Sequence, residues 1–348
     1  MHILHISPYM EQGGTERCII NLISQSLKNG YKISLVCPPG GGLKKIPLDV
    51  KIYKLKNWVL HKPFNAIAEL KEVALNIGKK ADLIQVHAAA EMAYLMRKYL
   101  PGKPIIFNCH GYDNFLSPYF NYWLASRFLK KVNCSVILNP FDKELFVGAG
   151  LKKDRLIFIP NGVEEKFFNF CKEKNNDKVV GFVGRLVKQK NILWAIKTQA
   201  KYRFSPRFLI VGDGPLRSKL EKLTKKLGMN KQIHFLGYKD SIEKVYPLFS
   251  YLLVCSRNEA FSLVILEALA SGVPVFIPEW LPGLVRLWQN APGVFVFENG
   301  KDLKRQINDK VGKNKEEKIQ DFARFFVWEN IFKKYQKLYF RVLNGNSL

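Results

Sequence analysis

The chain has 348 residues, of which 47% are hydrophobic and 24% are charged, so it is too long for one ordinary compact core, and its composition excludes disordered and fibrous proteins. Its 55 Lys and Arg residues against 29 Asp and Glu residues give a formal net charge of +26, which is spread over both halves. This charge favours an anionic partner, namely a phosphorylated ligand, an anionic membrane or a nucleic acid, and a lysine-rich surface that serves solubility is the alternative.

The first half of the chain alternates short apolar runs with stretches of helical spacing. Residues 2–7 form one apolar run, Gly13-Gly14 follows it, and apolar residues at helical spacing lead to a second run at residues 33–37. Further strands are predicted at residues 81–87, 104–110, 134–139 and 155–160. Strand, loop, helix and strand in this order open a parallel sheet with helices on its faces. We therefore expect one doubly wound α/β domain here.

A polar stretch at residues 171–178, rich in charge and Asn, is the best linker candidate in the chain. The alternation then restarts, with strands predicted at residues 179–184, 207–212, 232–237, 251–256 and 274–278. Helices are expected to begin near Asn191, Leu216, Ser241 and Ser262. The second half is thus predicted to form a second parallel sheet.

Aromatic and apolar residues recur at mostly helical spacing from Lys315 to Val342, which predicts one aromatic-faced helix that needs a partner surface. Two partners remain open, the helix's own domain and the preceding domain.

Arg185 and Lys190 follow the strand at residues 179–184 and precede a helix. In parallel α/β sheets, ligands bind beyond the carboxyl ends of the strands, where helix N-termini attract anions. A guanidinium fork beside a compact ammonium group suits a diphosphate, including one that departs as a leaving group. The alternative is two solvated cations in a basic protein.

Glu259, Phe261 and Ser262 lie in the strand-to-helix loop after residues 251–256, and Glu267 lies about two turns further on in an otherwise apolar segment. Burying an unpaired carboxylate is costly, so Glu267 needs a partner. A pair of ligand hydroxyls is one candidate, and a neighbouring loop that the side chain caps is the other.

In the first half, Gly13-Gly14 follows the first strand, and His110 follows the apolar strand PIIFN at residues 104–108. Glycine allows the backbone to approach a phosphate closely, although a Gly pair here is more often only a turn. His110 is followed by Gly111 at the carboxyl edge of the predicted sheet, which favours a ligand contact. His87 occupies a similar position and is a weaker candidate.

Several other chemistries lack support. The sequence has no Walker loop, no H-E-x-x-H motif or Cys cluster for a metal, no G-x-S-x-G elbow, and no dinucleotide fingerprint in the first strand-helix turn. Its six cysteines lie far apart, and it lacks a secretory leader and any apolar run of about 18 residues. We expect reduced cysteines and a cytoplasmic protein that is neither secreted nor membrane-spanning.

Taken together, these motifs resemble the family 4 retaining glycosyltransferases of the glycosyltransferase-B fold. The most specific match is the pair Glu259 and Glu267 combined with Arg185 and Lys190. The further matches are Ile159-Pro160-Asn161-Gly162-Val163, Gly13-Gly14-x-Glu16, His110-Gly111 and Val327-Trp328-Glu329.

The resemblance implies two Rossmann-like doubly wound parallel-sheet domains facing across a cleft. Residues 1–165 would bind the acceptor, residues 166–325 would bind the nucleotide sugar, and residues 326–348 would form a C-terminal helix packing back towards the N-terminal domain. The candidate catalytic residues are His110, Glu259, Arg185 and Lys190. The candidate donor-binding residues are Gly13, Gly14, Arg185, Lys190, Glu267, Phe261 and Ser262.

By resemblance, Arg185 and Lys190 bind the donor diphosphate, Glu267 binds the ribose hydroxyls, and Glu259 and His110 lie near the transferred sugar. The reaction retains anomeric configuration and needs neither a metal nor any cofactor besides the nucleotide-diphosphate sugar, for which UDP is the expected carrier. The acceptor is a glycan or a lipid-linked glycan in bacterial polysaccharide or lipopolysaccharide assembly. The sequence departs from the family at Ala260 and Arg286, where the family usually has Gly and Glu.

Aromatic residues beside basic ones at residues 44–62 and 117–131 suggest peripheral association with an anionic membrane at the inner face of the cytoplasmic membrane. The alternative is that these aromatic side chains belong to the core. The alternative function is a catalytically silent nucleotide-sugar-binding or scaffold protein of the same fold. No nucleic-acid partner is expected, because no zinc-finger, RNP or compact basic-stripe signature is present.

Overall fold

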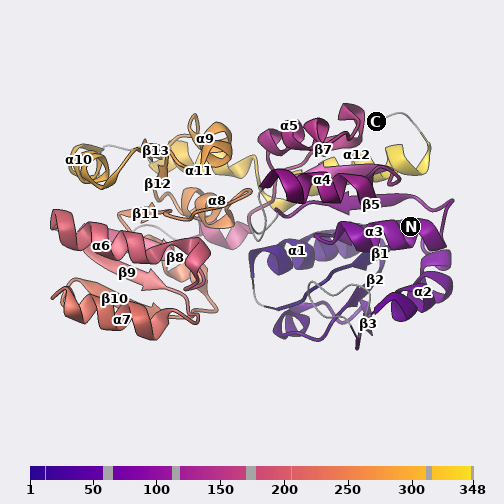
Figure 1. The fold of residues 1–348 in the computed structure, drawn as a ribbon, viewed down its shortest axis with the longest axis horizontal. Coiled ribbons are helices and arrows are strands. Elements are labelled where there is room, and N and C mark those ends of the chain that lie inside the picture. The colour runs from indigo at the N-terminus through magenta and orange to yellow at the C-terminus, as the bar shows by residue number, and fades with distance from the viewer. Residues whose placement is uncertain are drawn as a thin grey trace. The chain divides into compact units, whose positions relative to one another are not determined.

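The computed structural model describes residues 1–11, 13–57, 66–111, 118–169, 178–204, 206–310 and 316–345 (Figure 1). It divides into two compact units, one comprising Met1–Gly162 with Trp328–Leu348 and the other comprising Val163–Val327. Apart from Lys178, the linker candidate at residues 171–178 lies outside the described residues. Among the described residues, no helix combines the length and the apolar character that crossing a membrane requires.

The first unit contains a parallel sheet whose described strands follow the order β3-β2-β1-β4-β5-β6-β7. The strands are β1 (His2–Ile6), β2 (Lys32–Cys37), β3 (Lys51–Lys54), β4 (Leu83–His87), β5 (Ile105–Asn108), β6 (Cys134–Ile137) and β7 (Leu156–Phe158). The helices are α1 (Gly14–Lys28), α2 (Ile67–Asn76), α3 (Ala90–Tyr99), α4 (Pro118–Leu129), α5 (Pro140–Gly148) and α12 (Trp328–Leu343). The order reverses at β1, as in a doubly wound Rossmann sheet.

Alternate residues of these strands face opposite sides of the sheet. Leu4, Val86 and Phe107 are fully buried in an apolar cluster that includes residues of α2 to α5. On the opposite face, Gln85 and Asn108 form a buried hydrogen bond of 2.8 Å. The sheet therefore has one apolar face and one face with a buried polar network.

The C-terminal helix α12 closes this polar network. Tyr335 accepts a hydrogen bond from the Asn108 amide at 2.7 Å, and the Tyr339 hydroxyl donates to Gln85 Oε1 at 2.7 Å. All four side chains are buried, so their mutual hydrogen bonds remove the desolvation penalty that each would otherwise carry. Tyr335 and Tyr339 thus pack α12 within the first unit.

The second unit contains a parallel sheet whose described strands follow the order β10-β9-β8-β11-β12-β13. The strands are β8 (Val179–Val183), β9 (Arg207–Val211), β10 (Ile233–Gly237), β11 (Tyr251–Leu253), β12 (Val275–Pro278) and β13 (Val294–Phe297). The helices are α6 (Ile192–Tyr202), α7 (Arg217–Lys226), α8 (Leu263–Ala270), α9 (Pro282–Trp288), α10 (Gly300–Lys310) and α11 (Glu316–Arg324). The prediction of two doubly wound parallel sheets is confirmed.

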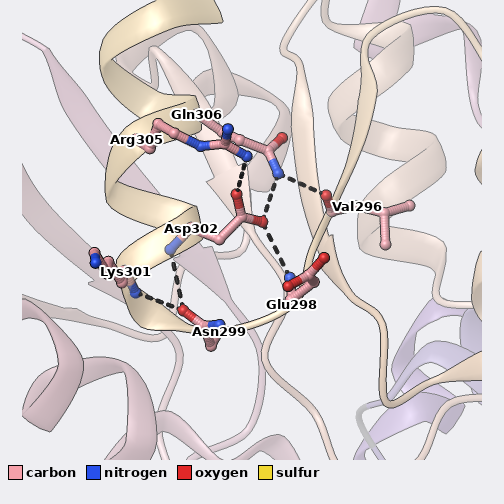
Figure 2. A network of polar contacts seen from close by, with 7 residues as sticks. All are labelled: Val296, Glu298, Asn299, Lys301, Asp302, Arg305 and Gln306. Atoms are coloured by element: carbon pink, nitrogen blue, oxygen red, sulfur yellow. Dashed lines mark hydrogen bonds and ion pairs between the residues drawn. The ribbon is translucent and has the colours of Figure 1, made fainter.

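The start of α10 shows how a local sequence signal fixes a helix boundary (Figure 2). Asn299 Oδ1 accepts hydrogen bonds from the backbone N–H groups of Lys301 and Asp302 at 3.0 and 3.1 Å. The Asp302 carboxylate in turn accepts from Gln306 Nε2 at 2.8 Å. The two bonds to Asn299 satisfy backbone N–H groups that have no partner within the first turn of a helix, and they anchor the helix after β13.

Two element predictions were wrong. The stretch after Ser241 forms two short 3-10 helices, Ile242–Lys244 and Tyr246–Leu248, because Pro247 lacks the N–H that a longer α-helix needs. The single helix predicted from Lys315 to Val342 is two helices, α11 and α12. They are separated because the chain extends at Val327 to form a parallel bridge with Val163.

The edge strands β3 and β13 were not predicted. β3 has the sequence KIYK and is only half-buried or exposed along its length, so it lacks the apolar run that identifies a buried strand. Five cysteines, Cys18, Cys37, Cys109, Cys134 and Cys255, are buried and form no disulfide, and Cys171 lies outside the described residues.

Candidate active site

The loop that carries Arg185 and Lys190 is held by backbone contacts at the carboxyl edge of the second sheet. The Gly184 N–H donates to Val211 O at 3.0 Å, and the Leu186 N–H donates to Asp213 O at 2.8 Å. A Cβ atom at Gly212, where φ is +127°, would lie 2.0 Å from Gly184 O. Only glycine allows the ends of β8 and β9 to meet so closely, and this contact places Arg185 at the sheet edge.

Lys190 and Glu259 come together within this edge. Lys190 Nζ lies 2.5 Å from Glu259 Oε1, and the same oxygen accepts a hydrogen bond from Ser256 Oγ at 2.8 Å. The side chains of Lys190 and Glu259 are 21% and 10% exposed, so the ion pair is partly shielded from water. The pair joins the loop after β8 to the loop after β11.

Backbone contacts fix these two loops to each other. The Arg257 N–H donates to Gln189 O at 2.8 Å, and Gln189 Nε2 donates to Asn258 O at 3.2 Å. The Cys255 thiol lies 3.3 Å from Lys190 O. The Lys190–Glu259 pair is therefore held from both loops and does not depend on two long side chains finding each other in solvent.

Arg185 differs from Lys190 in its surroundings. Its side chain is exposed, and it makes no hydrogen bond or ion pair with the part of the chain that the structure describes. Its five N–H donors are therefore available to an anion at the same sheet edge.

Glu267 lies on α8 and is 2% exposed. The Tyr246 hydroxyl donates to Glu267 Oε2 at 2.7 Å, which supplies one partner for the carboxylate from within the protein. A carboxylate has about four lone-pair sites, so this bond leaves room for ligand hydroxyls on the same side chain.

Phe261 and Ser262 form the turn that begins α8. The Phe261 ring is buried against Trp288 with ring centroids 5.2 Å apart, and its carbonyl accepts from Trp288 Nε1 at 2.9 Å. Ser262 has φ +65°, an unusual value for a residue with a side chain. Its hydroxyl is buried and has no hydrogen-bond partner among the described residues. A strained turn with an unsatisfied hydroxyl is typical of a ligand-binding position.

A pocket of about 270 Å³ lies beside this edge in the second unit. Its lining combines apolar side chains of α6 and α7, such as Ile192 and Leu220, with the cations Lys188, Lys219 and Arg257. An apolar cavity with a few basic groups at its wall suits an organic anion.

In the first unit, Gly13 precedes α1 and Gly14 is its first residue. A Cβ atom at position 13 would lie 2.6 Å from Glu16 Oε2, because the buried Glu16 side chain folds back over the start of the helix. A side chain at position 13 would therefore require the end of the Glu16 side chain to shift. The N-terminus of α1 carries the positive end of the helix dipole, which favours an anion.

His110 is partly exposed and follows β5. Its Nε2 atom lies 3.1 Å from His87 Nδ1, and His87 Nε2 lies 3.0 Å from His5 Nδ1. Burial lowers the pKa of His110 to about 4 and that of His5 to about 3, and burial together with the neighbouring histidines holds the pKa of His87 well below its usual range. All three imidazoles are therefore neutral at pH 7.

Sequence analysis missed three of these side chains. Ser256 and Tyr246 contact the two glutamates, and His5 extends the histidine chain. Two of them have a recognisable signal: Ser256 ends the predicted strand at residues 251–256, and His5 is a polar residue within a buried strand. Within the described residues, no group of three or more His, Cys, Asp or Glu side chains could hold a metal ion.

Two segments were proposed to contact an anionic membrane, and the one at residues 117–131 is partly described. Tyr122 and Leu129 of α4 are buried, whereas Trp123 is 43% and Leu124 is 40% exposed. The Arg127 guanidinium lies 4.7 Å from the Trp123 ring centroid. In the segment at residues 44–62, Trp58, Val59 and Leu60 lie outside the described residues.

Two family models match the chain. The model described as Glycosyltransferase Family 4 matches residues 12–167, and the model described as Glycosyl transferases group 1 matches residues 163–324. Between them they extend over both compact units and include every candidate site residue.

Curated relatives carry related descriptions. An uncharacterized glycosyltransferase of Methanocaldococcus jannaschii is 31% identical over 186 residues, which are 51% of this chain and 47% of that protein. A Campylobacter jejuni enzyme is 27% identical over 286 residues, 77% of each chain; its name is GalNAc-alpha-(1->4)-GalNAc-alpha-(1->3)-diNAcBac-PP-undecaprenol alpha-1,4-N-acetyl-D-galactosaminyltransferase.

Among solved structures, HepE of Anabaena in complex with UDP is similar in fold, with a TM-score of 0.79 and 19% identity over 97% of this chain and 99% of that one. The same protein has been crystallised with UDP-glucose.

Proposed function

Because this chain belongs to the family 4 glycosyltransferases of the glycosyltransferase-B fold, we propose that it transfers a sugar from a nucleotide-diphosphate sugar to a glycan or lipid-linked acceptor with retention of anomeric configuration. The observation that carries the proposal is the Lys190–Glu259 pair at 2.5 Å beside Arg185. This arrangement joins a fixed cation and a fixed carboxylate at the sheet edge where a parallel α/β domain binds its ligand.

Arg185 and Lys190 bind the donor diphosphate. The guanidinium of Arg185 has no partner among the described residues, and Lys190 is oriented by Glu259 and the surrounding loops. When the bond from the anomeric carbon to the diphosphate oxygen breaks, its electron pair stays on that oxygen. The two cations stabilise the charge that develops there, and the interaction grows towards the transition state.

The acceptor hydroxyl attacks the anomeric carbon from the face that the diphosphate leaves. The carbon passes through an oxocarbenium-like state, and the hydroxyl proton goes to the departing diphosphate oxygen. This step retains the configuration and uses no enzyme nucleophile. Glu259 lies near the transferred sugar, where it orients Lys190 and carries a charge that stabilises a cationic sugar ring.

Glu267 and Ser262 hold the donor from α8. The ribose hydroxyls donate to the Glu267 carboxylate, which keeps its bond from Tyr246. A donor oxygen accepts from the Ser262 hydroxyl, which gives that buried group the partner it lacks among the described residues. Gly13 and Gly14 of the first unit donate backbone N–H groups to the diphosphate, and His110 contacts the sugar.

We propose that the reaction needs no metal or further cofactor, because Arg185 and Lys190 supply the positive charge for the leaving group. EDTA should leave the turnover rate unchanged. A rate that falls with EDTA and returns with a divalent cation would contradict this point.

UDP is the proposed carrier and a lipid-linked glycan of a bacterial surface polysaccharide or lipopolysaccharide is the proposed acceptor. The UDP and UDP-glucose complexes of HepE and the undecaprenol-linked substrate in the name of the Campylobacter jejuni relative support these choices. Peripheral association with an anionic cytoplasmic leaflet follows from the lipid-linked acceptor and is supported by exposed Trp123 and Leu124 on α4. Liposome flotation should show more bound protein with anionic lipid than without it.

The decisive assay measures nucleotide release from UDP-, GDP- and ADP-sugars by the wild type, Arg185→Ala, Glu259→Gln and the control Lys197→Ala. Lys197 is an exposed cation on α6, so Lys197→Ala shows the effect of removing one positive charge without changing the candidate site. We expect release from one donor class, loss of about 100-fold or more for the two site variants, and no loss for the control. NMR of the product gives the anomer. Binding without release from any donor would favour the catalytically silent nucleotide-sugar-binding or scaffold protein.

A further inference from the structure

Three histidines form a diagonal chain across adjacent strands of the first sheet. In the β1–β4 register His5 pairs with Gln85, two residues before His87, and in the β4–β5 register His87 pairs with Asn108, two residues before His110. Each step therefore advances one strand across and two residues towards the carboxyl edge. The period of two keeps all three side chains on the same face, and the chain runs from buried His5 to partly exposed His110.

The rings are in direct contact along this chain. The centroids of His5 and His87 lie 5.3 Å apart, and those of His87 and His110 also lie 5.3 Å apart. The facing nitrogens lie at hydrogen-bond distances of 3.0 and 3.1 Å. Each contact therefore requires one N–H and one lone pair.

Neutral imidazoles allow only two proton arrangements in such a chain. In the first, His5 Nδ1–H donates to His87 Nε2, and His87 Nδ1–H donates to His110 Nε2. Because His110 Nε2 accepts, the proton of the neutral His110 ring lies on Nδ1. In the second, every bond is reversed, so His5 carries an N–H on Nε2 and His110 presents a lone pair at Nδ1. The tautomer of one ring thus fixes the other two.

The buried end of the chain selects between them. His5 is fully buried, and its Nε2 atom has no hydrogen-bond partner in the described part of the chain. The second arrangement would leave an N–H at this position without an acceptor, whereas the first leaves only a lone pair. Buried N–H groups without a partner are rarer in proteins than under-satisfied acceptors. The first arrangement is therefore favoured.

We propose that His5 and His87 are positioning residues that keep the proton of His110 on Nδ1, so that His110 offers an N–H donor to an oxygen of the bound donor sugar. The identity of the oxygen rests on the proposed function, whereas the position of the proton does not. His110 alone touches the substrate, and the two buried histidines act through it.

Imidazole ¹⁵N NMR of protein labelled at histidine tests the proton position without any ligand. Neutral histidine nitrogens with and without a proton resonate far apart, and single substitutions assign the signals of the six histidines. We expect a protonated Nδ1 in His5, His87 and His110 of the wild type. A protonated Nε2 in His110 of the wild type would overturn the proposal. His234→Gln, on β10 of the second unit, should leave the three signals unchanged.

Two variants at position 87 separate positioning from structural support. In His87→Asn the side-chain amide can still donate to His110 Nε2, so Nδ1 of His110 should stay protonated. In His87→Leu this donor is lost, and His110 should no longer hold a single tautomer. Loss of the tautomer in both variants, or in neither, would contradict the assigned role.

Kinetics link the tautomer to the sugar. With the donor identified by the release assay, His87→Leu should lower kcat/KM for that nucleotide sugar by about 10-fold, the effect of one hydrogen bond. It should leave the affinity for the free nucleotide diphosphate, which lacks the sugar, unchanged, and His87→Asn should restore most of the rate. Equal losses in sugar-nucleotide turnover and free-nucleotide binding would show a structural role. If no donor is turned over, the proposed function fails, and the NMR result still decides the proton position.

Discussion

Acidification should destabilise the first unit much more than the second. His5, His87 and His110 have pKa values lowered by burial, to about 3 for His5 and about 4 for His110. In the unfolded chain each histidine titrates near its ordinary value of about 6.5. Between pH 6.5 and the folded pKa values the unfolded state binds more protons, so the free energy of unfolding falls as the pH falls.

The magnitude follows from the number of groups that titrate. Each histidine that stays neutral in the folded protein lowers the free energy of unfolding by about 1.4 kcal/mol for each pH unit below pH 6.5. Asp142 acts in the opposite direction, because burial raises its pKa to about 6 despite a 2.7 Å hydrogen bond from Tyr122. Its folded form binds a proton first, so Asp142 offsets one histidine between about pH 6 and pH 4. The net loss at pH 5 is on the order of 4 kcal/mol, a large part of the stability of a typical domain.

Amide hydrogen exchange read by mass spectrometry reports the two units separately. After correction for the intrinsic exchange rate, the opening free energy of β1, β4 and β5 should fall by about 4 kcal/mol from pH 7 to pH 5, and that of β8 and β9 should fall less. Asp142→Asn should steepen the loss by about 1.4 kcal/mol per pH unit, because the opposing proton uptake is removed. The prediction fails if the opening free energy of the first unit does not change with pH, or if it falls equally in both units.

Two substitutions test packing. Gly212→Ala should destabilise the second unit by more than about 3 kcal/mol in urea unfolding, since its Cβ atom would lie 2.0 Å from Gly184 O. Gly102→Ala is the control, because a Cβ atom at position 102 would meet no atom within 4 Å. A Gly212→Ala protein as stable as the wild type would disprove the close contact. Tyr335→Phe should cost about 1–3 kcal/mol, because the buried amide of Asn108 loses its acceptor. An unchanged unfolding midpoint for Tyr335→Phe would show that the network does not hold α12 in place.

Much of the fold could be predicted because the central parallel strands form mostly apolar runs that lie between loops rich in Gly and Asn. Edge strands such as Lys51–Lys54 lack this signal. The division of the C-terminal stretch into α11 and α12 depends on a bridge between Val163 and Val327, residues far apart in the sequence. A helical pattern cannot reveal such a long-range contact.

The candidate site residues could be identified from the sequence, but the contacts between their side chains could not. The spacing of Arg185, Lys190 and Glu259 after predicted strands placed them at a sheet edge, but the contact of Lys190 with Glu259 depends on how two loops meet. The Tyr246 bond to Glu267 also joins distant segments, and Tyr246 precedes a proline in a stretch that was predicted to be helical.

Calorimetric binding of UDP, GDP and ADP to the wild type, Arg185→Ala and Lys197→Ala tests the central claim, the diphosphate site, most directly. The account predicts that UDP binds the wild type and the Lys197→Ala control equally, and that Arg185→Ala weakens binding by about 1.5–3 kcal/mol, or roughly 10-fold to 150-fold. No binding of any nucleotide to folded protein, or UDP binding that Arg185→Ala leaves unchanged, would contradict it.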